Sequence, residues 1–470
     1  MPIDRRSFLH SSTTLAGGAV LAPSLMGLAA CGQPRDATPL TPSPADGTPG
    51  YGEPKRSTDV PELFVPAGFR VARLSQTTMP SQADSGFIVP QALDGMACFA
   101  MPNGRLRLVR NHEMRDPAAA VVPLSARGAY DMKGGGGTTT LELRQERDGS
   151  VQLLREFVSL SGTHVNCAGG MTPWRTWITC EETTVGPAAG YEQPHGYCFE
   201  VPVDGDGVAP AVPLKAMGRF SHEAVAVDPA TDIVYLTEDR SWAADRPGTG
   251  SGFYRFLPNA RQRLAEGGRL QMLAVDGEPG LLTMQGQHRG VVRRTRWVEI
   301  ADPDPANAEQ EMGAVFHQGL ALGGAVFQRL EGCWYGDGGI FFNATSGGDA
   351  NAGQVWFFRP TGADGGELVL IFESPSPKIM DSPDNICVSP RGGIVICEDG
   401  SGVQFLHGLT TAGDRFDFIH TSTRSTEFCG ACFSPDGRTL FVNTQGSTSR
   451  TGTAIGATYA VWGAWERGAL

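Results

Sequence analysis

Six segments of the chain share one pattern, and this repetition limits the possible folds more than any other feature. Each segment has a polar residue, a short apolar strand, a turn with Pro or Gly, a second apolar strand, and then an acid or an amide. The segments begin at Asp94, Asn166, His222, His317, Asp384 and Glu427. Repeated hairpins of this kind predict an all-β fold, a β-propeller of about six blades with loop insertions. Helical periodicity is confined to a short piece near Asn307 to Gln310.

Polar residues begin and end these hairpins. In a propeller, the start of the first strand and the end of the second strand of each blade lie at the same face, so the six starting residues would form an inner ring. The strand ends would form a second ring of Glu113, Cys180, Glu181, Glu238, Asp239, Asp337, Glu398 and Asp399. Carboxylates crowded at one channel mouth repel each other unless multivalent cations bind there. For a single acid, capping of the hairpin through backbone N–H groups is the better explanation, but not for this many acids at equivalent positions.

The donor types narrow the choice of cation. Carboxylate and amide oxygens favour calcium or magnesium. Cys180, His112 and His222 add softer donors, which suit iron or another transition metal. The residue types therefore predict a mixed metal site.

Charge and cysteine content exclude several classes of function. The formal net charge of −12 argues against nucleic acid or an anionic membrane surface as a partner. An anionic substrate would need local cations that reverse this sign. Nine cysteines follow Cys31 without a regular framework spacing, so most are expected to be small buried apolar residues. The lone "CGAC" of Cys429 to Cys432 has no second pair and is not expected to bind zinc.

The N-terminus carries an export signal. Arg5 and Arg6 in "DRRSFLH" form a twin-arginine motif, and "LAAC" is a lipobox in which Cys31 would be lipidated. Residues 1–31 are therefore expected to direct export to the periplasm or the cell surface with a lipid anchor. Residues 32–59 are rich in Pro, Thr and Gly and are expected to be a disordered tether. The propeller would then occupy residues 60–470 and act as a monomer.

Several motifs resemble the PhoX-type alkaline phosphatase family. They are "NCAGGMTPWRTWITCEE", "GRFSHEAVAVDP", "YLTED", "MDSPDNICVSPRGGIVICEDG" and "EFCGACFSPDGRTLFVNTQ", within a region from roughly Gly68 to Trp465. The resemblance, to a shorter branch of the family, implies a β-propeller that hydrolyses phosphate esters with iron and calcium. It implies that Cys180 is an iron-bound thiolate and that Glu181, Glu238, Glu398 and Glu427 bind metal, with Asn166, His222 and Glu223 in matched motifs.

The implied mechanism is centred on metals, with Arg110, Arg219 and Arg240 beside the acidic strand ends as candidate phosphate contacts. Salt bridges to neighbouring carboxylates are an equal alternative for these arginines. Two other functions stay open: a calcium-dependent lactonase or other propeller hydrolase, and a binding or scaffold propeller whose metals are only structural. The first of them would not need Cys180, and the second would bind calcium without turnover of a phosphate ester.

Overall fold

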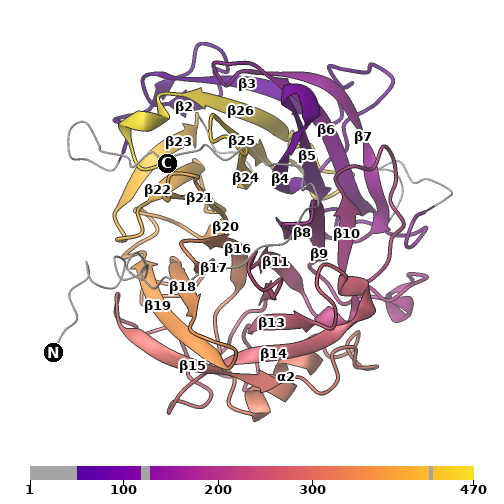
Figure 1. The fold of residues 1–470 in the computed structure, drawn as a ribbon, viewed down its shortest axis with the longest axis vertical. Coiled ribbons are helices and arrows are strands. Elements are labelled where there is room, and N and C mark those ends of the chain that lie inside the picture. Colours follow the sequence, from indigo (N-terminus) through magenta and orange to yellow (C-terminus); the bar gives the residue numbers. More distant parts are fainter. Residues whose placement is uncertain (1–49, 118–127, 423–426) are drawn as a thin grey trace, which may run out of the picture. The chain divides into compact units, whose positions relative to one another are not determined.

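Six strands form the innermost layer of the fold in a computed structural model that describes residues 50–117, 128–422 and 427–470. These strands are β4 (Leu93–Met101), β8 (Asn166–Met171), β11 (His222–Val227), β16 (Leu330–Gly336), β20 (Pro383–Val388) and β24 (Phe428–Phe433). Each one contacts the next, and β24 contacts β4, so the layer closes into a ring around a central axis (Figure 1). The sheets that radiate from it are the blades of a β-propeller, which confirms the predicted fold class.

Each inner strand begins one blade of antiparallel strands. The second strands are β5 (Arg105–His112), β9 (Thr176–Glu181), β12 (Val234–Glu238), β17 (Gly339–Ala344), β21 (Ile394–Glu398) and β25 (Thr439–Thr444). The third strands are β6 (Gly136–Gln145), β10 (Cys198–Pro202), β13 (Phe253–Pro258), β18 (Gln354–Pro360), β22 (Phe405–Leu409) and β26 (Ala457–Gly463). The outer strands are β7 (Val151–Thr163), β14 (Gly268–Val275), β19 (Gly365–Glu373), β23 (Arg415–Thr421) and β3 (Phe69–Gln76).

Segments from both ends of the described chain close the ring. Strand β3 pairs along its whole length with β26 and completes the blade that β24 begins. Pairing of this kind leaves no free sheet edge inside the ring. Outside the blades, β15 (Val292–Glu299) joins β14 to β19, while β1 (Lys55–Arg56) and β2 (Leu63–Val65) extend β23. Apolar side chains fill the space between neighbouring blades.

The folded unit begins earlier than the sequence predicts. Tyr51 is buried against Phe69 and Trp465, and its hydroxyl donates to the Leu470 carbonyl over 2.8 Å. Residues 50–59 are therefore part of the packed structure, because an aromatic side chain in the tether fills the core. The predicted signal, its lipobox and residues 32–49 lie outside the described residues.

The fourth repeat is misplaced in the sequence prediction. Its inner strand is β16, whereas His317 lies in α2 (Ala314–Ala321), and residues 307–310 form turns. Asp337 lies in the turn between β16 and β17, at the far end of that hairpin, and is ion-paired with Arg359 over 3.6 Å. Apolar residues of the helix mimic the first strand of a repeat, which shifts the alignment. Among the described residues, no helix is long and apolar enough to cross a membrane.

Candidate metal centre

A β-bulge recurs near the start of every inner strand. In each of the six first hairpins the register shifts two or three residues after the first pair. In five blades the residue after the first pair lies within this shift, and it is Asp94, Cys167, Glu223, Glu331 or Asp384. In the sixth blade Cys429 is still paired with Asn443, and the shift follows it. A bulge bends its strand and re-aims a side chain, so nearly the same irregularity recurs at the channel end of every blade.

The residue that follows the second strand of each blade supplies the other half of the site. These residues are Glu113, Glu182, Asp239, Thr345, Asp399 and Gln445. Gln445 shows where they point, because its amide donates to Asp94 over 3.1 Å and to Glu113 over 2.6 Å. The two sets of residues therefore meet at one mouth of the channel.

Nine of these polar residues and their neighbours form four overlapping groups, in which one ligand atom per residue lies within 4.8 Å of the others. The groups are Asp94, Glu113 and Cys167; Cys167, Glu182 and Glu223; Glu223, Glu331 and Asp384; and Asp384, Asp399 and Glu427. We call these nine residues the central cluster. It is buried on the Cys167 side and opens to solvent at Asp399.

Burial and mutual repulsion dominate the electrostatics of the central cluster. Burial first, and then the neighbouring carboxylates, raises the pKa of Asp94, Glu182, Glu223 and Glu331 well above its usual range. The same causes raise the pKa of Asp384 to about 7. The Cys167 thiol donates to Glu223 Oε1 over 3.3 Å, and burial raises its pKa as well. The cluster is thus a site where ionisation is costly unless positive charge is present.

Two arginines flank the central cluster. Arg115 contacts Glu113 and, over 3.0 Å, Glu182. Arg329 pairs with Asp239 over 2.9 Å and with Glu331 over 2.6 Å. Their side chains are 54% and 35% exposed, so both guanidinium groups can reach a ligand at the mouth. Neither was predicted, although each stands two positions from a cluster acid, Glu113 or Glu331.

Of the predicted metal ligands, Glu113, Glu223, Asp384 and Glu427 lie in the central cluster, and Asp239 lies against it through Arg329. Glu181, Glu238 and Glu398 do not. Each accepts a backbone N–H just before or at the third strand of its blade: Gly196 over 2.8 Å, Gly252 over 3.1 Å and Phe405 over 3.1 Å. Alternation along the strand turns the first acid of each pair into the blade and the second toward the channel.

The same one-residue offset affects Asn166 and His222, and Cys180 also lies outside the cluster. Cys180 is buried in an apolar cluster beside Cys198, so the thiol in the central cluster is Cys167 instead. Asn166 accepts a hydrogen bond from Thr163 of the preceding blade and donates one to Thr179 of its own blade. His222 bonds to the Gly218 carbonyl over 2.9 Å, and its neighbour Glu223 faces the channel. The bulge, which a repeat alignment does not reveal, causes this offset.

The predicted phosphate-binding arginines are structural, as is His112. Arg110 is fully buried and pairs with Glu156 over 2.7 Å. Arg219 donates to the carbonyls of His195 and Thr184. Arg240 lies 3.8 Å from Glu238 and stacks over Phe316. His112 bonds to the Gln91 carbonyl and to Thr139. The alternative of ion pairs with protein carboxylates holds for Arg110 and Arg240.

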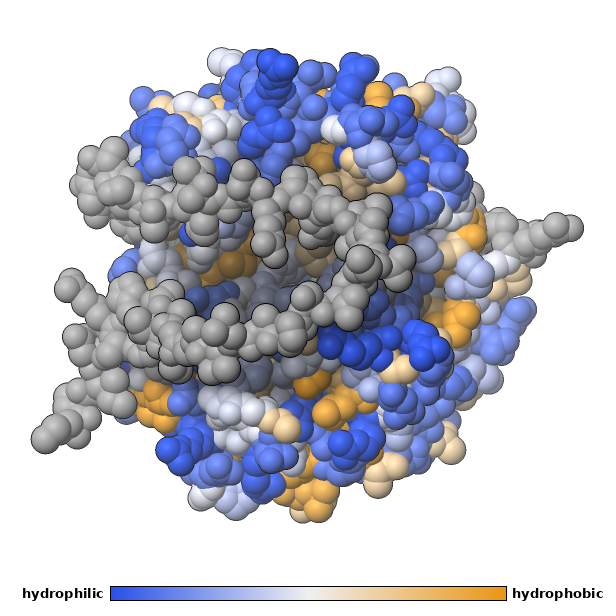
Figure 2. All heavy atoms as spheres, in the orientation of Figure 1, coloured by the Kyte–Doolittle hydropathy of each residue, from blue (hydrophilic) through white to orange (hydrophobic). Residues whose placement is uncertain are grey.

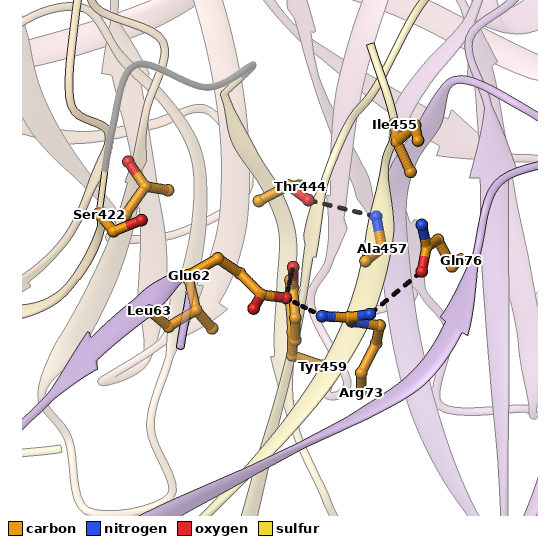
Figure 3. A pocket seen from close by; sticks show the side chains of 10 residues that line it. Glu62, Leu63, Arg73, Gln76, Ser422, Thr444, Ile455, Ala457 and Tyr459 are labelled. Carbon is orange, nitrogen blue, oxygen red and sulfur yellow. Dashed lines mark hydrogen bonds and ion pairs between the residues drawn. The ribbon is translucent and has the colours of Figure 1, made fainter. Parts of the chain in front are cut away.

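A pocket away from the central cluster is not suited to binding an anion. A pocket of about 260 Å³ lies at the seam between the last two blades, and Figure 3 shows Arg73 in it between Glu62 and Gln76. Arg73 is ion-paired with Glu62 and donates to Gln76 over 3.1 Å. The two charged lining residues thus neutralise each other. The part of the face that Figure 2 shows in colour is mostly hydrophilic, with apolar residues scattered over it.

Fold and site together define a β-propeller with an acidic centre, suited to cations, at one mouth of its channel. A model of the alkaline phosphatase PhoX family matches residues 50–447, and the chain therefore belongs to this family of phosphoric ester hydrolases. This match confirms the resemblance seen in the sequence motifs.

Comparison with solved structures gives one match that shares the fold. PhoX of Pseudomonas fluorescens, in complex with the transition-state analogue vanadate, superimposes with a TM-score of 0.67 at 19% identity, over 89% of this chain and 99% of that one. A gluconolactonase of Xanthomonas campestris gives a TM-score of 0.43 at 14% identity, over 90% of this chain and 99% of that one. No curated protein matches the sequence.

Proposed function

We propose that the chain hydrolyses phosphate esters at the central cluster and that the cluster holds calcium together with a transition metal, which the family resemblance suggests is iron. The observation that carries this proposal is the gathering of eight carboxyl groups and one thiol around a single channel mouth. The family match supports the reaction class. The vanadate complex of the Pseudomonas fluorescens protein shows that protein with a transition-state analogue, which supports a phosphoryl substrate here.

The residues present fit such metals. Asp94 Oδ1 and Glu223 Oε2 are buried and have no hydrogen-bond partner among the described residues. A buried carboxylate oxygen without a partner costs folding free energy, and a cation removes that cost. Cys167 with Asp94, Glu113, Glu182 and Glu223 offers the mixed sulfur and oxygen donors that suit iron. The groups around Asp384 offer only carboxylate oxygens, which suit calcium.

Metals, when bound, supply positive charge that offsets the charge developing on the phosphoryl oxygens. The chain's own residues bind and orient the substrate. Arg115 and Arg329 are partly exposed beside the acids, and each would give bidentate hydrogen bonds to phosphate oxygens. Glu182 and Asp239, which now pair with them, keep the two guanidinium groups at the mouth. Substrate enters from the Asp399 side, where the cluster is exposed.

The test is turnover of p-nitrophenyl phosphate at alkaline pH by the purified chain supplied with calcium and iron. Glu223→Gln keeps the shape of a residue shared by two groups, and it should lower the rate by at least about 10- to 100-fold. Glu146→Gln makes the same change at an exposed acid outside the central cluster. This variant is the matched control and should keep the wild-type rate. Equal rates in both variants, or no turnover by the metal-supplied wild type, would contradict the proposal.

A further inference from the structure

Two thiols outside the central cluster face each other across neighbouring strands. Cys180 of β9 and Cys198 of β10 are direct partners in the antiparallel register. Their Sγ atoms are 3.7 Å apart, and both side chains are completely buried. Of the nine cysteines that the structure describes, all are free thiols.

The backbone around this pair favours a covalent link. The Glu181 N–H donates to the Tyr197 carbonyl over 3.1 Å, which makes Glu181 and Tyr197 the hydrogen-bonded pair of the ladder. Cys180 and Cys198, the adjacent pair, therefore occupy a non-hydrogen-bonded position, where opposite side chains lie closest. A disulfide needs Cβ atoms about 3.5–4.5 Å apart, so small side-chain rotations bring the two sulfurs together.

A histidine stands beside one of the two thiols. His222 Nδ1 is 3.5 Å from Cys198 Sγ, and Nε2 is 2.9 Å from the Gly218 carbonyl. Because a carbonyl only accepts, Nε2 carries the proton and Nδ1 presents a lone pair to the Cys198 thiol. The pair lies in an apolar cluster that includes Met217 and Phe220. The geometry gives Cys198 a proton acceptor, and it gives Cys180 a sulfur partner, which is Cys198.

We propose that Cys180 and Cys198 are an oxidisable dithiol that a small hydroperoxide converts into a disulfide in the folded chain. The Cys198 sulfur attacks the peroxide, the O–O bond breaks, and Cys198 becomes a sulfenic acid as one water or alcohol leaves. The Cys180 sulfur then attacks the Cys198 sulfur, the S–O bond breaks, and a second water leaves. Two thiols are oxidised, one peroxide is reduced, and both thiol protons end in the products.

This link would constrain the segment that carries part of the central cluster. Residues 181–197 lie between the two cysteines, and they include Glu182 of the cluster and Glu181 with its partner His195. Closing this loop reduces the freedom of the unfolded chain and so favours the folded state. Oxidation would therefore raise the thermal midpoint of unfolding.

The experiment uses the purified, fully reduced full-length chain. It is treated with equimolar hydrogen peroxide, denatured in an alkylating reagent, digested and mapped by mass spectrometry without reduction. We expect a Cys180–Cys198 linked peptide, loss of alkylation at these two residues, and a thermal midpoint at least about 2 °C higher that a reductant reverses. Full alkylation of both residues after treatment would overturn the proposal.

Matched variants separate this pair from general thiol oxidation. Cys98→Ser removes another buried thiol and should leave the linked peptide unchanged. Cys180→Ser should abolish it and leave a sulfenic acid at Cys198 that dimedone traps. Links spread among the other seven described cysteines in the wild type would contradict a specific pair, and this readout needs no variant to fold.

Discussion

At the scale of single residues, one thiol lies among the eight carboxyl groups of the central cluster. Burial, and then Asp94 and Glu223, raises the pKa of Cys167, so the sulfur keeps its proton while no cation is present. The thiol donates to Glu223 over 3.3 Å, and Cys167 belongs to two of the four groups of the central cluster. A soft cation would displace the thiol proton and bind both the sulfur and the carboxylate of Glu223, which already contacts it.

Replacing Cys167 by serine should therefore remove the transition metal while leaving the propeller folded. Serine is similar in size, but its hydroxyl is a much weaker ligand for iron than a thiolate. We expect iron content and p-nitrophenyl phosphate turnover to fall by at least about tenfold in Cys167→Ser. The control is Cys98→Ser, a buried thiol on the same inner layer. Elemental analysis beside the assay would refute the assignment if Cys167→Ser retained iron at the wild-type level.

At the scale of elements, close contact between inner strands positions the central cluster. An added Cβ at Gly170 of β8 would lie 2.0 Å from the Val225 carbonyl oxygen of β11. Backbone on the neighbouring strand leaves no room for a side chain. Cys167 precedes Gly170 on β8, and Glu223 precedes Val225 on β11, so this contact sets the distance between two cluster residues.

Gly170→Ala should therefore destabilise the fold and loosen the cluster. Overpacking of this kind costs about 1–3 kcal/mol of unfolding free energy. Gly207→Ala, at an exposed glycine with no atom within 4 Å of the added Cβ, should be neutral. Urea unfolding and metal content, measured on both variants, check the prediction. A Gly170→Ala protein as stable as wild type would show that β8 can move without cost.

The hairpin repeats were sufficient to predict the propeller and five of its six inner strands. The repeat alignment was wrong at the fourth blade, because apolar residues of helix α2 resemble a first strand. It placed the start of the inner strand at His317 instead of Leu330. Most of the site was predicted to within one residue, since Cys167 and Glu182 are neighbours of predicted ligands, but Glu331 was missed because the fourth repeat was placed at His317. Which member of "CEE" faces the channel depends on strand register and on the bulge, and both are set by pairing with residues distant in the sequence.

At the scale of the whole molecule, a negatively charged protein must bind a negatively charged phosphate ester. The chain has a formal net charge of −12, and its channel mouth is acidic. Arg115 and Arg329 alone do not offset the eight carboxyl groups of the cluster. Binding of a phosphate ester thus depends on added cations, which ties substrate affinity to metal occupancy.

Export is a second property of the whole chain, and we propose that the twin-arginine segment directs it. Arg5→Lys combined with Arg6→Lys should leave a full-length precursor in the cytoplasm, because this route reads both guanidinium groups. Cys31→Ser should release the exported protein from the membrane fraction. Fractionation and lipid labelling check both outcomes, and normal export of the double lysine variant would refute the targeting prediction.

The most direct test of a cation site at the channel mouth is the pH dependence of stability with and without calcium. Burial and neighbouring carboxylates raise the pKa of Asp384 from 3.8 to about 7 in the folded chain, and the other cluster acids shift in the same direction. Between about pH 4 and 7 the folded chelated protein then holds more protons than the unfolded chain.

Its unfolding free energy should therefore be greatest near pH 4 and fall as the pH rises to 7, by about 1.4 kcal/mol per pH unit for each extra proton held. Calcium binds the ionised carboxylates of the folded state, so a calcium-saturated sample should lose this decline and become more stable than the chelated one at pH 7. Chemical denaturation across this range gives both curves. Two curves that coincide would contradict a metal centre built from these acids.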